Sequence, residues 1–243
     1  MKSIELFAGI GGMALAAGWA GIETIAFCEK DQFCQKVLKK HWPHVPIFDD
    51  IKKMNRQVLE EHGVIEKDGT VDLISGGFPC QPYSIAGKRR GKEDDRDLWP
   101  EMFRIIKEIR PTWVVGENVA NFANMELDRT LFDLESIGYR GRAFIIPACA
   151  VGAEHRRDRV FIVAHSSSKR LERVHNESNR IDLQLPKEII SGFKRKATPR
   201  VLRRGNGIPN RVDRIRALGN AVVPQQIYPV FKFIREIHEI ETK

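Results

Sequence analysis

Short apolar runs alternate with segments of helical periodicity along the first two thirds of the chain. Runs of four or five residues with strand-like composition lie at 3–7, 23–27, 71–75, 112–115, 142–146 and 160–164. Strands that alternate with helical segments predict an α/β fold with a mostly parallel sheet covered on both faces. The last two runs are joined by a short connection and predict a hairpin at one edge. One helical pattern ends at Pro111 and consists of Leu98, Met102, Phe103, Ile106 and Ile109.

The pattern breaks after residue 164 and returns near the end of the chain. Residues 166–207 are polar, basic and thinly apolar, with turn-forming triplets at both ends. We therefore expect an insertion in a larger domain, with residues 1–164 as the main domain, 165–216 as a short basic segment and 217–243 returning to the main domain. The returning helix is predicted by the i, i+3, i+4, i+7 spacing of Ile227, Val230, Phe231, Ile234 and Ile237.

Glycines follow the first predicted strand directly. They belong to the segment Phe7-Ala8-Gly9-Ile10-Gly11-Gly12, and the second strand ends at Glu29, 20 residues after Gly9. Glycines let the backbone approach a ligand, and an acid at the tip of a second strand accepts hydrogen bonds from ribose hydroxyls. The spacing is G-x-G-G and not G-x-G-x-x-G. It therefore favours a nucleotide-type site over a dinucleotide fingerprint, with a purely structural tight turn as the alternative.

The positive charge of the chain is concentrated in one segment. The chain has 243 residues, 42% of them hydrophobic, with 40 Lys and Arg against 32 Asp and Glu, a net charge of +8 and a pI of about 9.4. Residues 165–216 carry a balance of +9, so the rest of the chain sums to −1. A localised basic segment is typical of a nucleic-acid contact surface, because each neutralised phosphate releases counterions. An ordinary solvated basic surface is the alternative.

Three further patterns argue against a membrane protein, a metal site and a disulfide scaffold. The uncharged run at 6–22 is shorter than the roughly 20 residues of a membrane-spanning helix and contains five glycines, so we expect no membrane association and a cytoplasmic location. His41 and His44 bracket a proline, which favours a surface turn over a metal site. The cysteines lack C-x-x-C spacing and predict free thiols. Three of them are expected to be small buried side chains, namely Cys28, Cys34 and Cys149.

Cys80 differs because it follows the third predicted strand inside a Gly-Phe-Pro-Cys-Gln segment. The carboxyl ends of strands are where open α/β sheets place ligands. An unperturbed thiol is only a few per cent thiolate at neutral pH, so a nucleophilic cysteine needs help from charged neighbours. The segments that carry Glu117 and Asn118, and Arg157 and Arg159, flank later strands and are predicted to reach the same sheet edge.

In chain order these segments resemble the DNA cytosine-5 methyltransferase family, in a short bacterial or phage-type form. The resemblance spans nearly the whole chain and implies a Rossmann-like S-adenosylmethionine-dependent methyltransferase fold with a small target-recognition lobe. The matching segments are Phe7 to Gly12, Glu29, Asp50-Ile51, Gly77-Phe78-Pro79-Cys80-Gln81, Glu117-Asn118-Val119, Arg157-x-Arg159 and Gly219-Asn220-Ala221-Val222-Val223-Pro224.

The resemblance implies S-adenosylmethionine as the methyl donor and a cytosine flipped out of double-stranded DNA as the substrate. It implies that Cys80 attacks carbon 6 of the ring, that Glu117 holds or protonates nitrogen 3, and that Arg159 contacts the carbonyl oxygen, with Arg157 close by. Glu29 is then expected at the cofactor's ribose, Asp50 at its adenine and Asn220 near its amino-acid end. The full implied cofactor-binding set is Phe7, Ala8, Gly9, Ile10, Gly11, Gly12, Glu29, Asp50, Ile51, Pro79 and Asn220.

The chain departs from the family pattern in two places, and alternatives stay open. Lys30 stands where many members carry an aromatic residue, and the recognition segment has only about 50 residues. The basic loop at 81–92 is expected to close over DNA, with an ordinary solvated loop as the alternative. One alternative is an RNA cytosine methyltransferase that uses the same Cys80 and Glu117, and another is a DNA-binding module with little turnover. We expect a monomer, with a cognate restriction endonuclease as its candidate partner.

Overall fold

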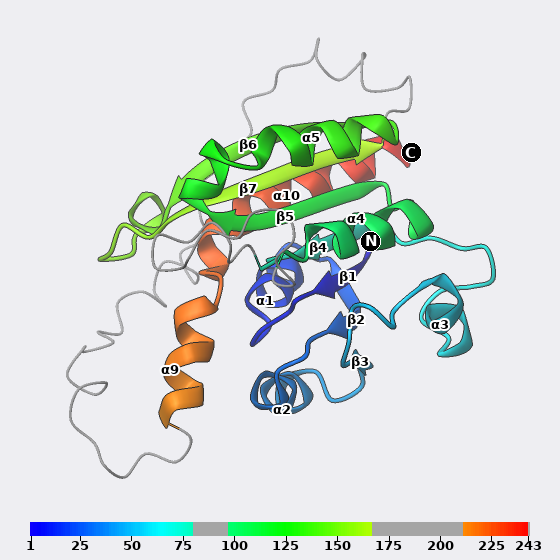
Figure 1. The fold of residues 1–243 in the computed structure, drawn as a ribbon, viewed down its shortest axis with the longest axis horizontal. Helices are drawn as coiled ribbons and strands as arrows, with labels where there is room; N and C mark the ends of the chain where they lie inside the picture. Colours follow the sequence, from blue (N-terminus) through cyan, green and yellow to red (C-terminus); the bar gives the residue numbers. More distant parts are fainter. Residues whose placement is uncertain (80–96, 167–210, 243) are drawn as a thin grey trace.

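A computed structural model describes residues 1–79, 97–166 and 211–242. Its centre is a sheet of strand order β3-β2-β1-β4-β5-β7-β6 (Figure 1). Neighbouring strands from β3 to β5 are parallel, whereas β7 runs antiparallel to both β5 and β6. The strands are β1 (Lys2–Leu6), β2 (Glu23–Cys28), β3 (Ile47–Phe48), β4 (Leu73–Gly76), β5 (Trp113–Val119), β6 (Tyr139–Pro147) and β7 (Asp158–Ser166).

Helices cover both faces of this sheet, as the alternating sequence pattern predicts. One face packs against α1, α2 and α10, and the other against α3, α4 and α5. The α/β prediction with a mostly parallel sheet is therefore confirmed. The described helices are α1 (Gly12–Trp19), α2 (Gln32–His41), α3 (Arg56–Glu61), α4 (Trp99–Ile109), α5 (Leu127–Ser136), α9 (Arg211–Asn220) and α10 (Pro224–Glu241), with 3₁₀ turns η3 (Ala120–Asn124) and η4 (Ala148–Val151).

Side chains of successive strand residues alternate between the two cores. Trp113 and Val115 of β5 join Phe161 of β7 in the core beneath α1 and α10. Val114 and Ile162 point the opposite way, into the core beneath α4 and α5. Because both faces are covered, these strands carry apolar residues at nearly every position.

The predicted C-terminal helix is confirmed as α10. Its apolar stripe is buried against α1 and the middle of the sheet, and includes Ile227, Phe231, Ile234 and Ile237. The last segment of the chain thus completes one face of a sheet that begins at residue 2 (Figure 1).

The structure confirms the edge hairpin and corrects three details. β6 and β7 pair along their whole length at the sheet edge. The expectation that Glu117 and Asn118 follow a strand is wrong, because β5 continues to Val119 and pairs with β7 throughout. A short strand, β3, lies at a place where no strand was expected. Cys149 is exposed and not buried, because it lies in the η4 turn outside both cores.

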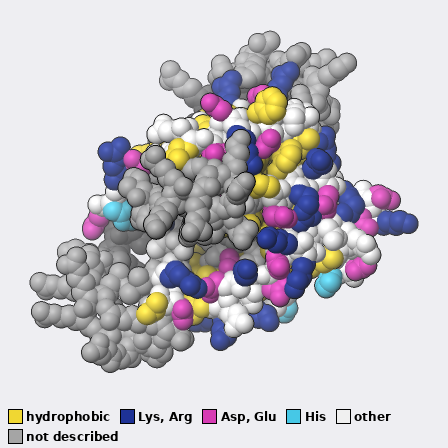
Figure 2. All heavy atoms as spheres, in the orientation of Figure 1, with side chains coloured by type: hydrophobic (Ala, Val, Ile, Leu, Met, Phe, Trp, Pro, Cys, Tyr) yellow, Lys and Arg dark blue, Asp and Glu magenta, His cyan; other side chains and the backbone are white. Residues whose placement is uncertain are grey.

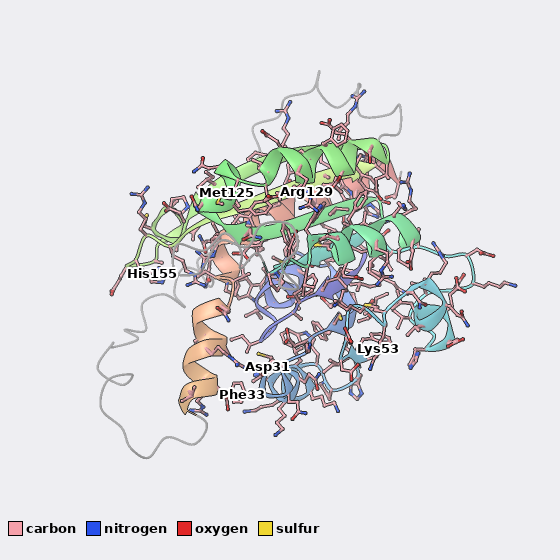
Figure 3. All side chains as sticks on the ribbon, viewed as in Figure 1. Asp31, Phe33, Lys53, Met125, Arg129 and His155 are labelled. Carbon is pink, nitrogen blue, oxygen red and sulfur yellow. The ribbon has the colours of Figure 1, made fainter. Side chains whose placement is uncertain are left out.

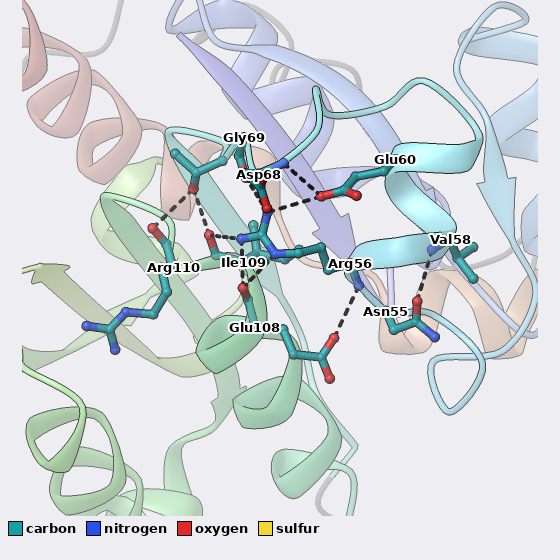
Figure 4. Close-up of polar contacts among 10 residues, drawn as sticks. Asn55, Arg56, Val58, Glu60, Asp68, Gly69, Glu108, Ile109 and Arg110 are labelled. Atoms are coloured by element: carbon teal, nitrogen blue, oxygen red, sulfur yellow. Dashed lines mark hydrogen bonds and ion pairs between the residues drawn. The ribbon is translucent and has the colours of Figure 1, made fainter.

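Two arginines fasten α4 to the segments that precede β4. Arg56, at the start of α3, donates hydrogen bonds to the carbonyls of Glu108 and Gly69 at 2.7–3.1 Å (Figure 4). The carbonyls at the last turn of a helix have no partner within the helix, so a guanidinium is well suited there. Arg104 donates to the carbonyls of Ile51 and Met54 at 2.8 and 2.9 Å. These bonds hold the turn that carries Asp50 and Ile51.

On the face shown in Figure 2, Lys and Arg side chains lie interspersed with Asp and Glu over the described residues. This mixture matches the near-neutral balance outside residues 165–216. Most of that basic segment, and the basic loop at 81–92, lie outside the described residues. Within the described part of the chain, no helix has the length and apolar character needed to cross a membrane.

Candidate active site

A cavity of about 840 Å³ opens at the carboxyl ends of β1, β2, β4 and β5. The chain order reverses here, because β1 is followed outward by β2 and β3 on one side and lies next to β4 on the other. Ligands of open α/β sheets bind outside such a reversal. The volume is in the range of small-molecule sites.

Most of the predicted site residues meet in this cavity. Pro79 lines it and Cys80 lies outside the described residues, while Ile10, Gly11 and Arg157 are not part of the lining. The other lining residues from the predicted set are Phe7, Ala8, Gly9, Gly12, Glu29, Asp50, Ile51, Glu117, Arg159 and Asn220.

Packing explains the glycines of the turn between β1 and α1. Gly11 has a φ of 81°, and a Cβ there would lie 2.6 Å from the ring of Trp42. At Gly12 a Cβ would lie 2.7 Å from the carbonyl oxygen of Val222. The turn is therefore pressed between α2 on one side and the segment before α10 on the other, and only glycine fits at both positions.

Glu29 extends from the end of β2 over this turn. Its two carboxylate oxygens accept hydrogen bonds from the backbone N–H groups of Gly9 and Asp31, each at 2.7 Å. Burial raises the pKa of Glu29, while hydrogen bonding to the backbone of Gly9 and Lys30 and the charge of Arg216 oppose the shift. Because each carboxylate oxygen has a second lone pair, Glu29 can still accept from a ligand hydroxyl. Asp50 lies on the same side of the cavity and accepts from the N–H of Lys52 at 3.0 Å.

Asp31 links this rim to the C-terminal part of the chain. It caps α2 by accepting from Phe33 and Cys34 at 2.8 and 3.1 Å, and it forms an ion pair with Arg216 of α9. Figure 3 shows Asp31 at the start of α2, on the side that faces α9. Arg216 also lines the cavity, so α9 contributes to its rim.

Glu5 is a lining residue that the sequence pattern did not single out. It lies on β1 with only 3% of its surface exposed and accepts hydrogen bonds from the N–H groups of Met13 and Ala14 at the start of α1. Burial raises the pKa of Glu5 to about 8. Its Oε2 atom is buried and has no hydrogen-bond partner among the described residues. The signal available in the sequence was an acid between the core residues Ile4 and Leu6.

Glu117 and Arg159 form the charged centre of the cavity. Residue 117 pairs with Phe161 and residue 159 with Val119, so the two side chains are diagonal neighbours on one face of the sheet. Nε of Arg159 lies 2.8 Å from Oε1 of Glu117. Burial raises the pKa of Glu117 to about 7, and the charges of Arg159 and Arg157 act against the rise. A carboxyl that titrates near neutral pH can act as a general acid or base.

The loop that leads to Cys80 runs directly against this pair. A Cβ at Gly77 would lie 2.9 Å from Oε2 of Glu117, and Asn118 donates a hydrogen bond from Nδ2 to the carbonyl of Phe78 at 3.1 Å. The two motifs are about 40 residues apart in sequence, and their adjacency comes from the β4–β5 pairing. The residues that lead to Cys80, Gly77 and Phe78, therefore lie against Glu117 and Asn118.

The other cavity cysteines are poor candidates for a nucleophile. Cys28 and Cys34 both line the cavity and are buried. Burial raises the pKa of Cys34 to about 11, and it raises that of Cys28 as well. Since only the thiolate is strongly nucleophilic, both are inert at neutral pH. His41 and His44 are exposed near the end of α2, and the described residues contain no group of three or more His, Cys, Asp or Glu that fits a metal ion.

Arg157 is not among the residues that line the cavity. Its Nη2 atom donates hydrogen bonds to the carbonyls of Gly219 and Ala221, both at 2.8 Å. These carbonyls flank Asn220, which lines the cavity. The two arginines of the Arg-x-Arg motif thus have different surroundings.

Comparison with known proteins assigns this arrangement to a family. The family model of C-5 cytosine-specific DNA methylases matches residues 1–204. The chain belongs to this family. The resemblance inferred from the ordered motifs is thereby confirmed, and the match runs from the glycine turn through the loop before Cys80 to the Arg-x-Arg hairpin.

Several curated methylases of this family are similar in sequence. Type II methyltransferase M.AquIA from Picosynechococcus is 32% identical over 195 residues, which are 73% of this chain and 78% of that protein. M.HhaI from Haemophilus parahaemolyticus is 31% identical over 192 residues, and M.PspPI from Psychrobacter is 40% identical over 142 residues. The alignment with M.HhaI covers 77% of this chain and 53% of M.HhaI. The alignment with M.PspPI covers 56% of this chain and 32% of M.PspPI.

Solved structures share the fold of this chain. A triple mutant of Spodoptera frugiperda DNMT2 superposes with a TM-score of 0.55 and 25% identity, covering 68% of this chain and 49% of that one. The Entamoeba histolytica methyltransferase EhMeth has a TM-score of 0.56 and 18% identity, covering 69% and 53%. The Rossmann-like fold of the chain is therefore shown by these structures as well as by its own strand order.

Proposed function

We propose that this protein transfers a methyl group from S-adenosylmethionine to carbon 5 of a cytosine flipped out of double-stranded DNA. The observation that carries the proposal is the contact of the Gly77–Phe78 loop with Glu117 and Asn118, beside Arg159. It brings the segment before Cys80 to a carboxyl that titrates near neutral pH. Membership of the cytosine-5 methylase family supports the same reading.

The residues of the cavity fit S-adenosylmethionine. Glu29 has free lone pairs for ribose hydroxyls, Asp50 lies on the same side for an adenine amino group, and Asn220 lies across the glycine turn for the amino-acid end. The buried Oε2 atom of Glu5 lacks a partner in the same cavity, as expected of a site that holds a polar ligand. When bound, this cofactor supplies an electrophilic methyl group.

Cytosine needs activation because its carbon 5 is a poor nucleophile. In the proposed reaction the Cys80 thiolate adds to carbon 6 and forms a C–S bond, and the ring electrons shift toward nitrogen 3. Glu117 donates a proton or a hydrogen bond to nitrogen 3 and so neutralises the developing charge. Carbon 5 then takes the methyl group, with S-adenosylhomocysteine as the leaving group. A base removes the carbon 5 proton, the electrons of that bond restore the ring double bond and expel the Cys80 thiolate, and nitrogen 3 returns its proton to Glu117.

Arg159 and the shape of the cavity serve the same step. Arg159 orients the carboxyl of Glu117 through its Nε atom and has further N–H groups for the carbonyl oxygen at carbon 2 of the ring. None of the reacting ring atoms is accessible inside a duplex. The cytosine therefore has to leave the base stack, at a cost of about a few kcal/mol.

The decisive experiment traps the covalent adduct. DNA that carries 5-fluorocytosine should form a denaturation-resistant complex with the parent protein in the presence of S-adenosylmethionine, because fluorine at carbon 5 cannot be removed as a proton. Cys80→Ala should abolish the complex and keep cofactor binding, measured by calorimetry. The exposed Cys149 provides the matched control, and Cys149→Ala should trap normally. An undiminished adduct in Cys80→Ala would reject the assignment.

The polymer and the biological setting are tested separately. Bisulfite sequencing after incubation with duplex DNA or with RNA of the same sequence distinguishes DNA methylation from RNA methylation, and we expect the signal in DNA. Binding of DNA and cofactor without incorporation of labelled methyl would indicate a binding module. We further propose that the protein is a cytoplasmic monomer and that it protects DNA from a cognate restriction endonuclease. The protection is tested by measuring whether the methylated DNA resists cleavage by that endonuclease.

A further inference from the structure

Arg157 occupies a constrained position at the entrance to β7. It is a non-glycine residue with a φ of 34°, in the left-handed region that such residues rarely adopt. Its guanidinium is outside the cavity and donates from Nη2 to the carbonyls of Gly219 and Ala221, 62 and 64 residues further along the chain. Backbone strain of this kind persists only where surrounding contacts hold it.

Gln226 of α10 binds the backbone of Arg157. It lies fully buried near the start of α10. Its Nε2 atom donates to the carbonyl of Arg157 at 3.0 Å and to that of Ile146 at 2.6 Å. The side chain of Arg157 thus binds the turn before α10, while a side chain of α10 binds the backbone of Arg157.

The turn between these contacts reaches the cavity. Asn220, Ala221 and Val222 line it, and the carbonyl oxygen of Val222 lies where a Cβ at Gly12 would clash. The turn therefore packs against the glycine turn and forms part of the cavity wall. Gly219 and Ala221, whose carbonyls Arg157 holds, are the immediate neighbours of Asn220.

We infer that Arg157 is a positioning residue, which together with Gln226 forms a clasp that holds residues 219–222, and with them Asn220, at the wall of the cofactor cavity. The Arg-x-Arg motif then divides its work between two sites, since Arg159 orients Glu117 and Arg157 orients the cofactor wall. The inference rests on the proposed function for the identity of the cofactor.

The clasp also sets how the chain returns from its basic segment. The segment 165–216 ends inside α9 (Arg211–Asn220), and residues 221–223 then connect α9 to α10. With the carbonyls on both sides of Asn220 bound by Arg157, the residue that precedes β7, the end of α9 is fixed relative to the cavity.

The first test measures affinity for S-adenosylhomocysteine by calorimetry. Arg157→Met removes both hydrogen bonds and should weaken binding about tenfold, in line with the loss of one to two charge-assisted hydrogen bonds. Arg157→Lys should retain part of the affinity. Arg156→Met is the matched control, because this neighbouring guanidinium is largely exposed and pairs only with Asp158 among the described residues. Arg159→Met should reduce methyl transfer with little change in this affinity.

A double-mutant cycle separates positioning from general loss of structure. If Arg157 acts through Asn220, then Arg157→Lys should weaken binding in the parent but add little in an Asn220→Ala background. Additive losses, or unchanged affinity in a folded Arg157→Met protein, would overturn the clasp.

Hydrogen exchange keeps the inference independent of the cofactor's identity. Amides of residues 219–226 should exchange faster in Arg157→Lys and in Gln226→Met than in the parent, with or without ligand. Unchanged exchange would overturn the clasp. Failure of the parent protein to bind S-adenosylhomocysteine would instead reject the proposed function, with the exchange result still deciding on the clasp.

Discussion

Arg159 and Glu117 meet across two antiparallel strands, with Nε of the arginine 2.8 Å from Oε1 of the carboxylate. They are diagonal neighbours in the β5–β7 pairing, so the distance is set by the sheet and not by a flexible loop. A buried carboxylate is costly without a partner. Here burial raises the pKa of Glu117 to about 7 and the adjacent guanidinium limits the rise, which leaves the group able to exchange a proton near neutral pH.

Replacing Glu117 by Gln should slow single-turnover methyl transfer by roughly 10² or more, because the side chain can no longer supply a proton to the ring. Since the parent carboxyl has a pKa of about 7, it loses its proton as the pH rises through neutrality, and kcat/KM should decline above that point. This decline should be absent in Glu117→Gln. A near-normal rate, or an unchanged decline in the variant, would contradict the role.

Removing the positive charge of Arg159 should shift the pKa of Glu117. The charge of Arg159 lowers the pKa of Glu117, so in Arg159→Met the pKa should rise and the decline of kcat/KM should shift to higher pH while the rate falls. Arg156→Met serves as the control and should leave the profile in place. The measurement is the pH dependence of single-turnover methyl transfer, and a stationary decline in Arg159→Met would count against the pairing.

The buried carboxyl of Glu5 should lower the free energy of unfolding as the pH rises. Below about 4.5 both the folded and unfolded states hold its proton, and between about 4.5 and 8 only the folded state does. The free energy of unfolding therefore falls across this window, by about 1.4 kcal/mol for each unit of pKa difference at most. Glu5→Gln removes this effect, so its Tm relative to the parent should increase from pH 5 to pH 9. Exposed Glu23→Gln is the control, and a constant Tm difference for Glu5→Gln would contradict the assignment.

Asp31 combines a helix cap with an ion pair, and two substitutions separate them. Asp31→Ala loses the cap of α2 and should cost about 1 kcal/mol of unfolding free energy. Asp31→Asn keeps a capping oxygen and loses only the ion pair with Arg216, whose side chain is 61% exposed, so its stability should stay close to the parent. Urea unfolding measures both. Equal losses would show that the ion pair, and not the cap, carries the stability.

The basic segment at 165–216 should dominate the salt dependence of DNA binding. Arg203 and Arg204 lie outside the described residues, and this prediction rests on the charge balance of +9. Affinity should fall with a log–log slope of about −0.9 per phosphate contact, and neutralising both arginines should flatten the slope. An unchanged slope would place the contact elsewhere, for example on the loop at 81–92.

The same segment is too short to read a long target. Each good bidentate contact to a base contributes only about 1–3 kcal/mol of discrimination, so we expect a recognition site of roughly two to four base pairs. Methylation mapping in cells that express the protein tests this directly. A strict site of six or more base pairs would show that the segment, or a partner, reads more.

The sequence by itself determined the layered α/β architecture, the C-terminal helix and the family. Periodicity reports whether each residue is buried, and the glycine, Pro-Cys-Gln, Glu-Asn-Val and Arg-x-Arg segments keep their order along the chain. The helical spacing from Ile227 to Ile237 needed no knowledge of its partner, because an amphipathic stripe specifies a buried face whatever covers it.

Only the tertiary structure decided which of these residues touch. The sequence placed Arg157 and Arg159 together. Arg159 lies in β7 and its guanidinium reaches Glu117, whereas Arg157 precedes the strand with a φ of 34° and its guanidinium reaches the carbonyls beside Asn220. Glu5 was hidden in an apolar strand, and its significance lies in the burial that the helix α1 imposes on it. A local pattern specifies which face of a strand is buried. It does not specify which residue of a distant strand or helix lies beside that face, because this depends on how the elements pack.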